Sequence, residues 1–285
     1  MDQTSVFNAT HLPEDSNPTF ASAQVGLKPL DQPNSITFVT AYFEIYPPNS
    51  NNKSREMRFE NFAKLARTKI PILVFTDKQS RPFFEPFENE CNLQFIVLNF
   101  KDLLTYKETY ATGVTVLPEQ RCPKKDTVDF MILMNAKAEF MKLAIDNSKS
   151  THYCWIDFSI FYVFKQPEES IEYLKTFSKK TLQPSFFAIP GCWQEGSYKD
   201  LLWNSINWRY CGGFFVADKK SLLDFYTLYR KVYQKILFLS GRMTWETNIW
   251  HLLELEYGWK PNWFKADHND SICHLPLEFF TLAGE

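Results

Sequence analysis

An acidic residue directly after a short apolar run is the feature of this sequence that most clearly suggests chemistry. Residues 153–156, Tyr-Cys-Trp-Ile, predict a buried strand, and Asp157 comes next. A carboxylate in that position is carried to the rim of the sheet, where open α/β sheets bind their ligands. Ser159 lies two residues further on, so on a continuing strand both oxygen-bearing side chains would share a face.

Oxygen ligands with this spacing suit Mg²⁺ or Mn²⁺, hard cations that usually bind through one or two carboxylates together with substrate phosphates. The sequence therefore predicts a divalent metal ion bound by Asp157 and Ser159. The alternative is a turn aspartate whose side chain accepts a local hydrogen bond from the backbone.

The elements that would position Asp157 alternate between strand and helix. The expected order is strand 36–43, helix 57–66, strand 71–77, strand 93–98, helix 130–147 and strand 153–156, then strands 185–189 and 214–217 and helices 221–238 and 244–256. Thr244 is a suitable N-cap for the last helix. Strand, helix and strand in this order indicate parallel βαβ units with right-handed crossovers.

The domain organisation follows from this pattern. Residues 1–34 are rich in Asn, Pro, Ser and Asp and show no sustained period, which predicts an extended or partly disordered N-terminal lead. No Ser/Gly linker divides the remainder. Residues 35–285 are therefore expected to form a single α/β domain with a mostly parallel central sheet flanked by helices.

Bulk composition disfavours several function classes. With 31 basic and 33 acidic residues and a formal charge of −2, the chain has no global positive field for nucleic acid. No apolar stretch approaches the roughly 18 residues of a membrane span, and the N-terminus lacks the features of a signal peptide, which predicts a cytoplasmic protein. Six irregularly spaced cysteines without a C-x-x-C motif argue against a zinc knuckle or a redox pair.

Polar residues follow three of the predicted strands. Thr40-Ala41 ends the first, Thr76-Asp77 the second, and Asp157 the fourth. If the strands are parallel, these ends converge on one edge of the sheet. The sequence lacks G-x-G-x-x-G, G-x-x-x-x-G-K-[ST] and G-x-S-x-G, which disfavours dinucleotide oxidoreductases, P-loop NTPases and α/β-hydrolases.

Two later segments could contact a substrate. Trp208-Arg209-Tyr210-Cys211-Gly212-Gly213 has the composition of a sugar-contacting turn, because glycines let the backbone approach a ligand and aromatic rings supply flat apolar faces. The alternative is an ordinary tight turn. Glu246 would lie in the first turn of the last helix, where the helix dipole stabilises an anion.

Four segments in this order resemble the HtrL/YibB group of glycosyltransferases with a GT-A fold. They are Phe38 to Ile45, Asn135 to Lys137, Trp155 to Ile160 and Cys211 to Phe214. The resemblance covers roughly residues 35 to 270, and the order of the segments is a stronger signal than any one of them. It implies a nucleotide-diphospho-sugar transferase domain.

The resemblance also implies a metal site, because GT-A enzymes use a D-x-D motif at the end of a central strand to bind a divalent cation. Here the motif is Asp157-Phe158-Ser159, in which a neutral serine replaces the second acid. Metal affinity should therefore be lower than with two acids. GT-A enzymes often supply a histidine near the C-terminus, and His268 matches that position.

The remaining roles are also implied by the resemblance. Nucleotide and diphosphate contacts are expected from Thr40, Ala41, Tyr42, Asp77, Arg58 and Lys137; donor-sugar and acceptor contacts from Gly212, Gly213, Trp208 and Arg209; and general-base catalysis from Glu246. Tyr42 could stack on uracil. Arg58, with Arg55, could neutralise phosphate charge, since guanidinium groups pair bidentately with phosphate.

The expected function is metal-dependent transfer of a sugar from a nucleoside diphosphate donor, with a UDP-sugar favoured, to a hydroxyl of a glycan or glycoprotein. Inversion at the anomeric carbon is favoured if Glu246 is the base. One alternative is a noncatalytic nucleotide- or sugar-binding protein with a degraded D-x-D motif. Another is a nucleotidyltransferase, although the Gly-rich phosphate loop that such enzymes use after the first strand is missing here.

Overall fold

The computed structural model describes residues 35–47, 53–88, 92–114 and 116–281. The predicted N-terminal lead, residues 1–34, lies outside the described residues.

A seven-stranded sheet forms the centre of the described chain, in the order β3-β2-β1-β4-β6-β5-β7. Its strands are β1 (Ile36–Tyr42), β2 (Ile72–Thr76), β3 (Leu93–Val97), β4 (His152–Ile156), β5 (Phe187–Gly191), β6 (Phe214–Asp218) and β7 (Asn262–Lys265). β6 pairs antiparallel with β4 and β5, and the other neighbouring strands pair in parallel. The predicted α/β class with a mostly parallel sheet is confirmed.

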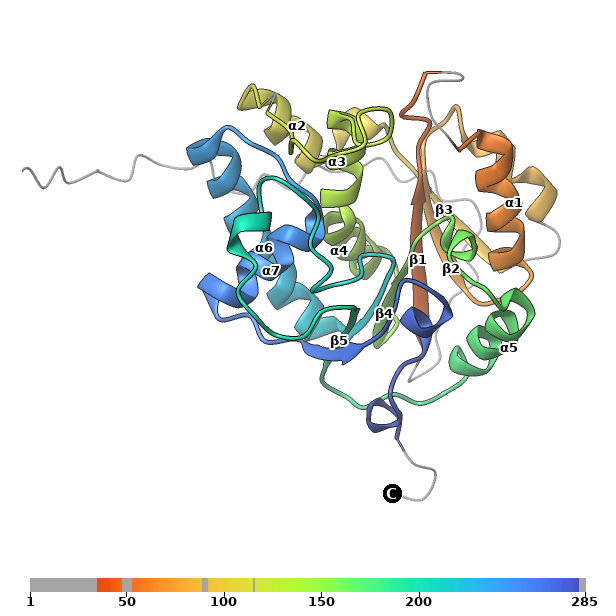
Figure 1. Ribbon diagram of the computed structural model, residues 1–285. Helices are drawn as coiled ribbons and strands as arrows, with labels where there is room; N and C mark the ends of the chain where they lie inside the picture. Colours follow the sequence, from red (N-terminus) through yellow and green to blue (C-terminus); the bar gives the residue numbers. More distant parts are fainter. Residues whose placement is uncertain (1–34, 48–52, 89–91, 115, 282–285) are drawn as a thin grey trace, which may run out of the picture.

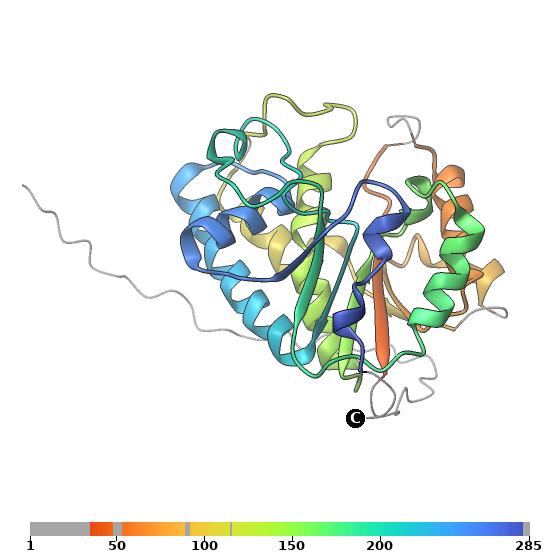
Figure 2. The same cartoon turned by 60° about the horizontal axis from the view of Figure 1, so that its bottom comes forward.

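Helices cover both faces of this sheet (Figures 1 and 2). One face carries α1 (Arg55–Ala66) and α5 (Pro167–Phe177). The other carries α2 (Leu104–Ala111), α3 (Val128–Asn135), α4 (Lys137–Asn147), α6 (Lys219–Ser240) and α7 (Glu246–Tyr257). Short 3-10 turns are η1 (Arg81–Phe87), η2 (Phe100–Asp102), η3 (Ile160–Tyr162), η4 (Lys199–Leu201), η5 (Asp270–Cys273) and η6 (Leu277–Phe279).

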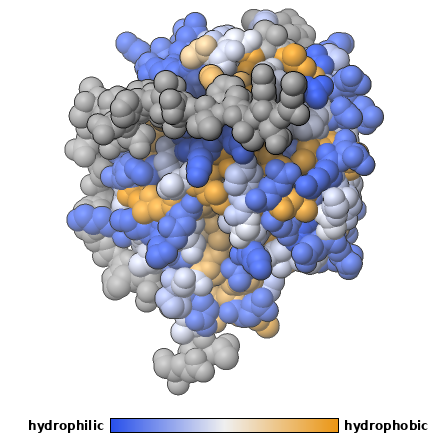
Figure 3. Space-filling model, turned by 90° about the vertical axis from the view of Figure 1, so that its left-hand side faces the viewer, coloured by the Kyte–Doolittle hydropathy of each residue, from blue (hydrophilic) through white to orange (hydrophobic). Residues whose placement is uncertain are grey.

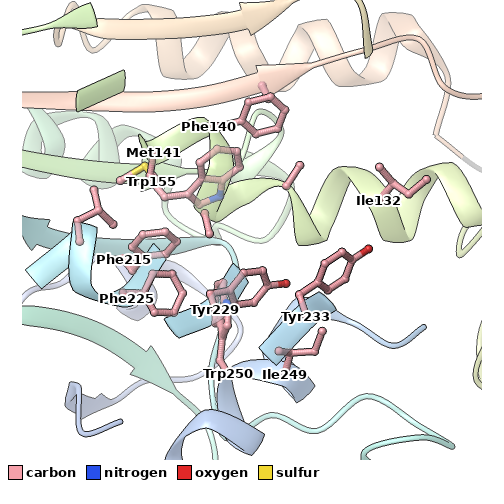
Figure 4. Close-up of a cluster of buried hydrophobic side chains, with 14 of the residues drawn as sticks. Ile132, Phe140, Met141, Trp155, Phe215, Phe225, Tyr229, Tyr233, Ile249 and Trp250 are labelled. Atoms are coloured by element: carbon pink, nitrogen blue, oxygen red, sulfur yellow. The ribbon is translucent and has the colours of Figure 1, made fainter. Parts of the chain in front are cut away.

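The alternation of side chains along the strands divides the apolar residues between two cores. In β1, Val39 packs into the core beneath α4 and α6, whereas Phe38 packs into the core beneath α1 and α5. In the α4–α6 core, Trp155 of β4 stacks on Phe140 with ring centroids 6.1 Å apart (Figure 4). Much of the high aromatic content is therefore core packing, which fixes the position of β4.

The predicted helix 130–147 is two helices, α3 and α4, with a break at Ala136. The side chain of Asn135, the last residue of α3, makes long-range contacts at this break. Its amide nitrogen donates to the carbonyl oxygens of Met131 (2.7 Å) and Thr244 (3.0 Å). A buried polar contact of this kind is not visible in the apolar period. Lys137 is the first residue of α4.

Thr244 is not the N-cap of α7, contrary to the prediction. The helix begins at Glu246, Trp245 occupies the cap position, and the Thr244 hydroxyl donates instead to the carbonyl oxygen of Leu202 at 2.6 Å. The sequence analysis also missed α2, α5 and β7. Of these, α5 carried a recognisable start signal, because Pro167 is its first residue and acidic residues follow in its first turn.

The side of the molecule on which α6 lies is mainly hydrophilic, with apolar residues in small separate areas among the coloured atoms (Figure 3). Within the residues that the structure describes, no helix combines the length and apolar character needed to cross a bilayer.

Candidate active site

A cavity of about 490 Å³ lies where the carboxyl ends of β1 and β4 meet. The chain runs outward from β1 through β2 to β3 and then returns to β4 on the other side of β1, so this is the switch point of the sheet. Ala41 and Tyr42 line the cavity from β1, Asp157 from the end of β4, and Gly212 and Gly213 from the turn before β6. The predicted convergence of strand ends is confirmed for β1 and β4.

Asp157 lies in this cavity with defined partners. Its backbone N–H donates to the Gly213 carbonyl oxygen at 2.9 Å, and its Oδ1 accepts from Trp155 Nε1 at 2.8 Å. The same Oδ1 lies 3.1 Å from Lys137 Nζ. The side chain is 36% exposed, so the carboxylate faces the cavity while one of its oxygens is anchored.

Lys137 anchors Asp157 from beneath the cavity. Its side chain is 1% exposed, and its ammonium group donates to the Gly212 carbonyl oxygen and to Glu246 Oε1, both at 2.8 Å. Burial alone would lower the pKa of Lys137, but the carboxylates of Asp157 and Glu246 raise it more, and the pKa ends above its usual value. The side chain is therefore a permanent cation shared by two acids.

Glu246 lies in the first turn of α7, as predicted, but it is buried and does not line the cavity. Gly212 lies between Glu246 and the cavity. A Cβ added to Gly212 would come 2.3 Å from Glu246 Oε1 and 3.2 Å from Lys137 Nζ. A glycine is therefore required for the close approach of this backbone to the Lys137–Glu246 pair.

Ser159 and His268 are the other predicted metal ligands, and both line the cavity. β4 ends at Ile156 and Ser159 precedes η3, so the shared strand face expected for Asp157 and Ser159 does not exist. The buried Ser159 hydroxyl has no hydrogen-bond partner among the described residues. Burial lowers the pKa of His268, whose ring lies 4.9 Å from that of Trp208.

The structure divides the predicted site residues into three groups. The cavity is lined by Ala41, Tyr42, Arg58, Asp157, Ser159, Trp208, Gly212, Gly213 and His268. Lys137 and Glu246 lie behind its wall. Thr40, Asp77 and Arg209 do not line it.

The three residues outside the cavity lining have local roles. Thr40 is fully buried within β1. Asp77 accepts a hydrogen bond from the Ser80 backbone N–H at 2.6 Å, which is the local turn that a strand-terminal aspartate often makes. Arg209 is buried and pairs with Glu254 through two hydrogen bonds of 2.6 and 2.9 Å.

The sequence was then compared with known proteins. A family model described as "Bacterial protein of unknown function (HtrL_YibB)" matches residues 34–270. The chain belongs to the HtrL_YibB family. None of the curated proteins compared with this chain is similar to it in sequence.

Solved structures similar to this HtrL_YibB protein include a glycosyltransferase involved in glycosylation of the major capsid of PBCV-1, at 10% identity and TM-score 0.39, over 82% of both chains. Another is 4-diphosphocytidyl-2C-methyl-D-erythritol synthase from Anaerococcus prevotii, at 11% identity and TM-score 0.38, over 82% of this chain and 90% of that one. A third is a manganese complex of a Mycobacterium tuberculosis protein, at 7% identity and TM-score 0.39, over 83% and 90%.

Tyr42 of this HtrL_YibB protein is placed differently from its predicted role. Its ring packs against Phe59 and Phe158, its hydroxyl donates to Glu44 Oε2 at 2.9 Å, and only 4% of the residue is exposed. Little of the ring face is open to a base. Tyr46, which the sequence analysis did not select, is half-buried in the cavity wall.

Two lysines of the cavity were also missed. Lys53 lies at the end of the loop after β1, and Lys125 lies in the loop before α3. Lysines in polar loops are usually solvated surface residues, so neither stands out in the sequence. Arg55, considered with Arg58 as a phosphate ligand, does not line this cavity. Its Nη1 lies 3.8 Å from Glu44 Oε2, in an ion pair.

Proposed function

We propose that this protein is a glycosyltransferase with a GT-A-like fold, which transfers a sugar from a nucleoside diphosphate donor, first of all a UDP-sugar, to a hydroxyl of a glycan. One observation carries the proposal: Asp157 faces a cavity at the switch point of a parallel sheet, among cationic and aromatic side chains. A donor with a flat base, a ribose, a diphosphate and a sugar matches that mixture of groups.

Within this proposal the donor is oriented by the groups that line the cavity. Ala41 and Tyr46 would contact the base and ribose near the end of β1. Trp208, Gly212 and Gly213, which also line the cavity, would contact the donor sugar and the acceptor. Gly212 and Gly213 give the ligand access to the backbone beside Asp157, and Trp208 offers an apolar ring face to the sugar.

A divalent cation fits the residues present only if the donor supplies much of its coordination. The available donors are one Asp157 carboxylate oxygen, the Ser159 hydroxyl without a partner, and the His268 imidazole, which its lowered pKa keeps neutral. The described residues contain no cluster of three or more His, Cys, Asp or Glu side chains suited to a metal. Such a set favours Mn²⁺, which accepts nitrogen and oxygen ligands; when bound, it would neutralise charge on the diphosphate.

We assign Glu246 a positioning role, because it pairs with Lys137 behind the cavity wall. The predicted inverting mechanism needs a base within hydrogen-bonding reach of the acceptor hydroxyl. Glu246 would meet that requirement only after Gly212 moved aside. As a positioning residue it fixes Lys137, which in turn anchors Asp157.

The Glu246→Gln variant distinguishes the two roles by steady-state kinetics. A positioning residue should raise KM for the donor and lower kcat together, because the anchor of Asp157 is weakened. Transfer lowered by ~10²-fold with unchanged donor affinity would instead identify Glu246 as the base.

The proposed activity is tested by UDP release from a panel of UDP-sugars with Mn²⁺. Asp157→Ala should abolish Mn²⁺-dependent turnover while leaving a folded protein. Asp77→Ala is the matched control, since Asp77 also follows a strand but lies outside the cavity lining. Full turnover by Asp157→Ala would refute the assignment.

The same assay separates the alternatives. Asp157 is the single carboxylate among the described residues that line the cavity, which favours a noncatalytic binding protein as the second candidate. Such a protein should show a thermal shift with UDP-sugars and release no UDP, even slowly and without an acceptor. Release of pyrophosphate from a nucleoside triphosphate and a sugar phosphate would identify a nucleotidyltransferase.

A further inference from the structure

Two cysteines that are distant in the sequence meet beside the turn before β6. Cys192 and Cys211 are separated by 19 positions, and their Sγ atoms lie 3.5 Å apart as free thiols. Cys192 directly follows β5, and Cys211 directly precedes Gly212 and Gly213 of the turn. The sequence analysis argued against a redox pair because no C-x-x-C motif is present, but the fold brings together two thiols with a much longer spacing.

The backbone segments that carry the two thiols are already joined by hydrogen bonds. The Cys192 N–H donates to the Trp208 carbonyl oxygen at 2.9 Å, and the Cys211 N–H donates to the Pro190 carbonyl oxygen at 2.8 Å. A disulfide bond is about 2.05 Å long and forms without unfolding only where the two backbones lie close together. Because these hydrogen bonds hold the backbones together, a small local movement is sufficient to join the sulfur atoms.

The two thiols differ in their exposure to solvent. Cys192 is partly exposed, whereas Cys211 is buried. Oxidation of a cysteine requires access of the oxidant to its sulfur atom. A small oxidant can therefore reach Cys192 first, and Cys211 lies close enough to react with the oxidised sulfur atom.

We propose that Cys192 and Cys211 are a modification site at which hydrogen peroxide forms a reversible disulfide, and that this bond loosens the neighbouring wall of the cavity. The Cys192 sulfur attacks one peroxide oxygen and breaks the O–O bond, which gives a sulfenic acid and one water. The Cys211 sulfur then attacks the Cys192 sulfur and releases a second water. The two thiols lose two electrons and two protons, and one peroxide is reduced to two waters.

The cavity wall begins immediately after Cys211. The Gly212 carbonyl oxygen accepts from Lys137 Nζ at 2.8 Å, and the Gly213 carbonyl oxygen accepts from the Asp157 backbone N–H at 2.9 Å. Cys211 is closely packed, with only 1% of the residue exposed, so a movement of its sulfur atom toward the other thiol is passed to the adjoining backbone. The disulfide should therefore weaken both hydrogen bonds, and with them the anchoring of Asp157.

The first test is peptide mapping of the full chain by mass spectrometry after treatment with hydrogen peroxide. The wild type should give tryptic peptides 181–199 and 210–219 joined by a disulfide, and dithiothreitol should separate them. Cys192→Ala and Cys211→Ala should each abolish the joined peptides. Cys122→Ser is the matched control, because it removes an exposed thiol elsewhere and should leave the bond intact. Absence of the joined peptides from oxidised wild type would overturn the proposal.

Hydrogen exchange measures the effect on the cavity without any substrate. The Asp157 backbone N–H, which donates to Gly213, should exchange ~10-fold or more faster in the oxidised wild type than in the reduced protein. Cys192→Ala treated with the same peroxide should keep the slow rate, which separates the disulfide from oxidation of other side chains. Equal acceleration in both proteins, or none in a wild type that carries the disulfide, would overturn the link between the thiols and the cavity.

Turnover is a second measurement, and it rests on the proposed function. UDP-sugar turnover by the oxidised wild type should fall ~10-fold or more and return after dithiothreitol, because small displacements of positioned groups are costly. Cys192→Ala should be equally active before and after peroxide. A protein that forms the disulfide and exchanges Asp157 faster but turns over no UDP-sugar would support the modification site and refute the glycosyltransferase. An active glycosyltransferase that forms no bond between Cys192 and Cys211 would do the reverse.

Discussion

The buried ion pair between Lys137 and Glu246 gives the sharpest test of how this site is held together. In Lys137→Met, the apolar side chain fills a similar volume but removes the ammonium group. Glu246, whose side chain is 6% exposed, would then lose its 2.8 Å partner and remain a buried carboxylate. Asp157 is 36% exposed and can be hydrated instead, so the cost falls mainly on Glu246.

The expected magnitude follows from that burial. Removing one partner of a buried pair costs about 3–5 kcal/mol, because the remaining charge is desolvated and uncompensated. Adding Glu246→Gln to Lys137→Met removes that charge. The double variant should therefore be more stable than Lys137→Met alone, with a coupling free energy of at least about 1 kcal/mol.

The measurement is urea unfolding at neutral pH of the wild type, both single variants and the double variant. Lys220→Met is the control, because Lys220 pairs with Asp224 at 2.6 Å while 83% of its side chain is exposed, so no measurable loss is expected. If Lys137→Met and the double variant unfold at the same urea concentration, Glu246 does not depend on Lys137 for its charge compensation and the argument fails.

Two further predictions concern packing and acid stability. Gly212→Ala should lower the free energy of unfolding by about 2 kcal/mol and lower donor turnover, because the new Cβ would lie 2.3 Å from Glu246 Oε1. Gly213→Ala should lower the free energy of unfolding less, as measured by thermal melts of both variants, because its Cβ would lie no closer than 3.0 Å to a neighbouring atom. Burial would raise the pKa of Glu254, but hydrogen bonds from Arg209 lower it from 4.5 to about 2. The ionised Glu254 side chain therefore stabilises the folded protein fully above pH 4.5, and this stabilisation is lost as the pH falls toward 2. Between pH 4.5 and 2 the free energy of unfolding of the wild type, measured by urea unfolding at stepped pH, should fall by up to about 3 kcal/mol more than that of Glu254→Gln. Parallel plots of the free energy of unfolding against pH for the two proteins would contradict the stabilising role of Glu254.

Local sequence was sufficient where a short-range pattern decides the structure. The apolar runs at 36–43, 71–77 and 153–156 gave three parallel strands that are buried on both faces and are therefore continuously apolar, and the run at 93–98 gave the less buried edge strand β3. The order of strands and helices then placed the ends of β1 and β4 together, so the position of Asp157 at the sheet rim was predictable.

Long-range contacts decided the rest, since they join residues that no local pattern connects. At the break in the predicted helix, Asn135 donates a hydrogen bond to Thr244, more than a hundred positions away. Lys137 and Glu246 are equally far apart in sequence, and their pairing behind the cavity wall was not foreseen when Glu246 was predicted to be the catalytic base.

The sequence by itself determined the α/β class, the parallel strands and the one acid at the mouth of β4, because these depend on side-chain period and on chain order. Only the tertiary structure decided which charged groups share the cavity. Lys53 precedes α1, Arg58 lies within α1 and Lys125 lies in the loop before α3, and they meet at the cavity because the sheet and helices fix where these segments lie. A charge cluster is a property of distances in space, and the linear spacing of loop lysines carries no information about those distances.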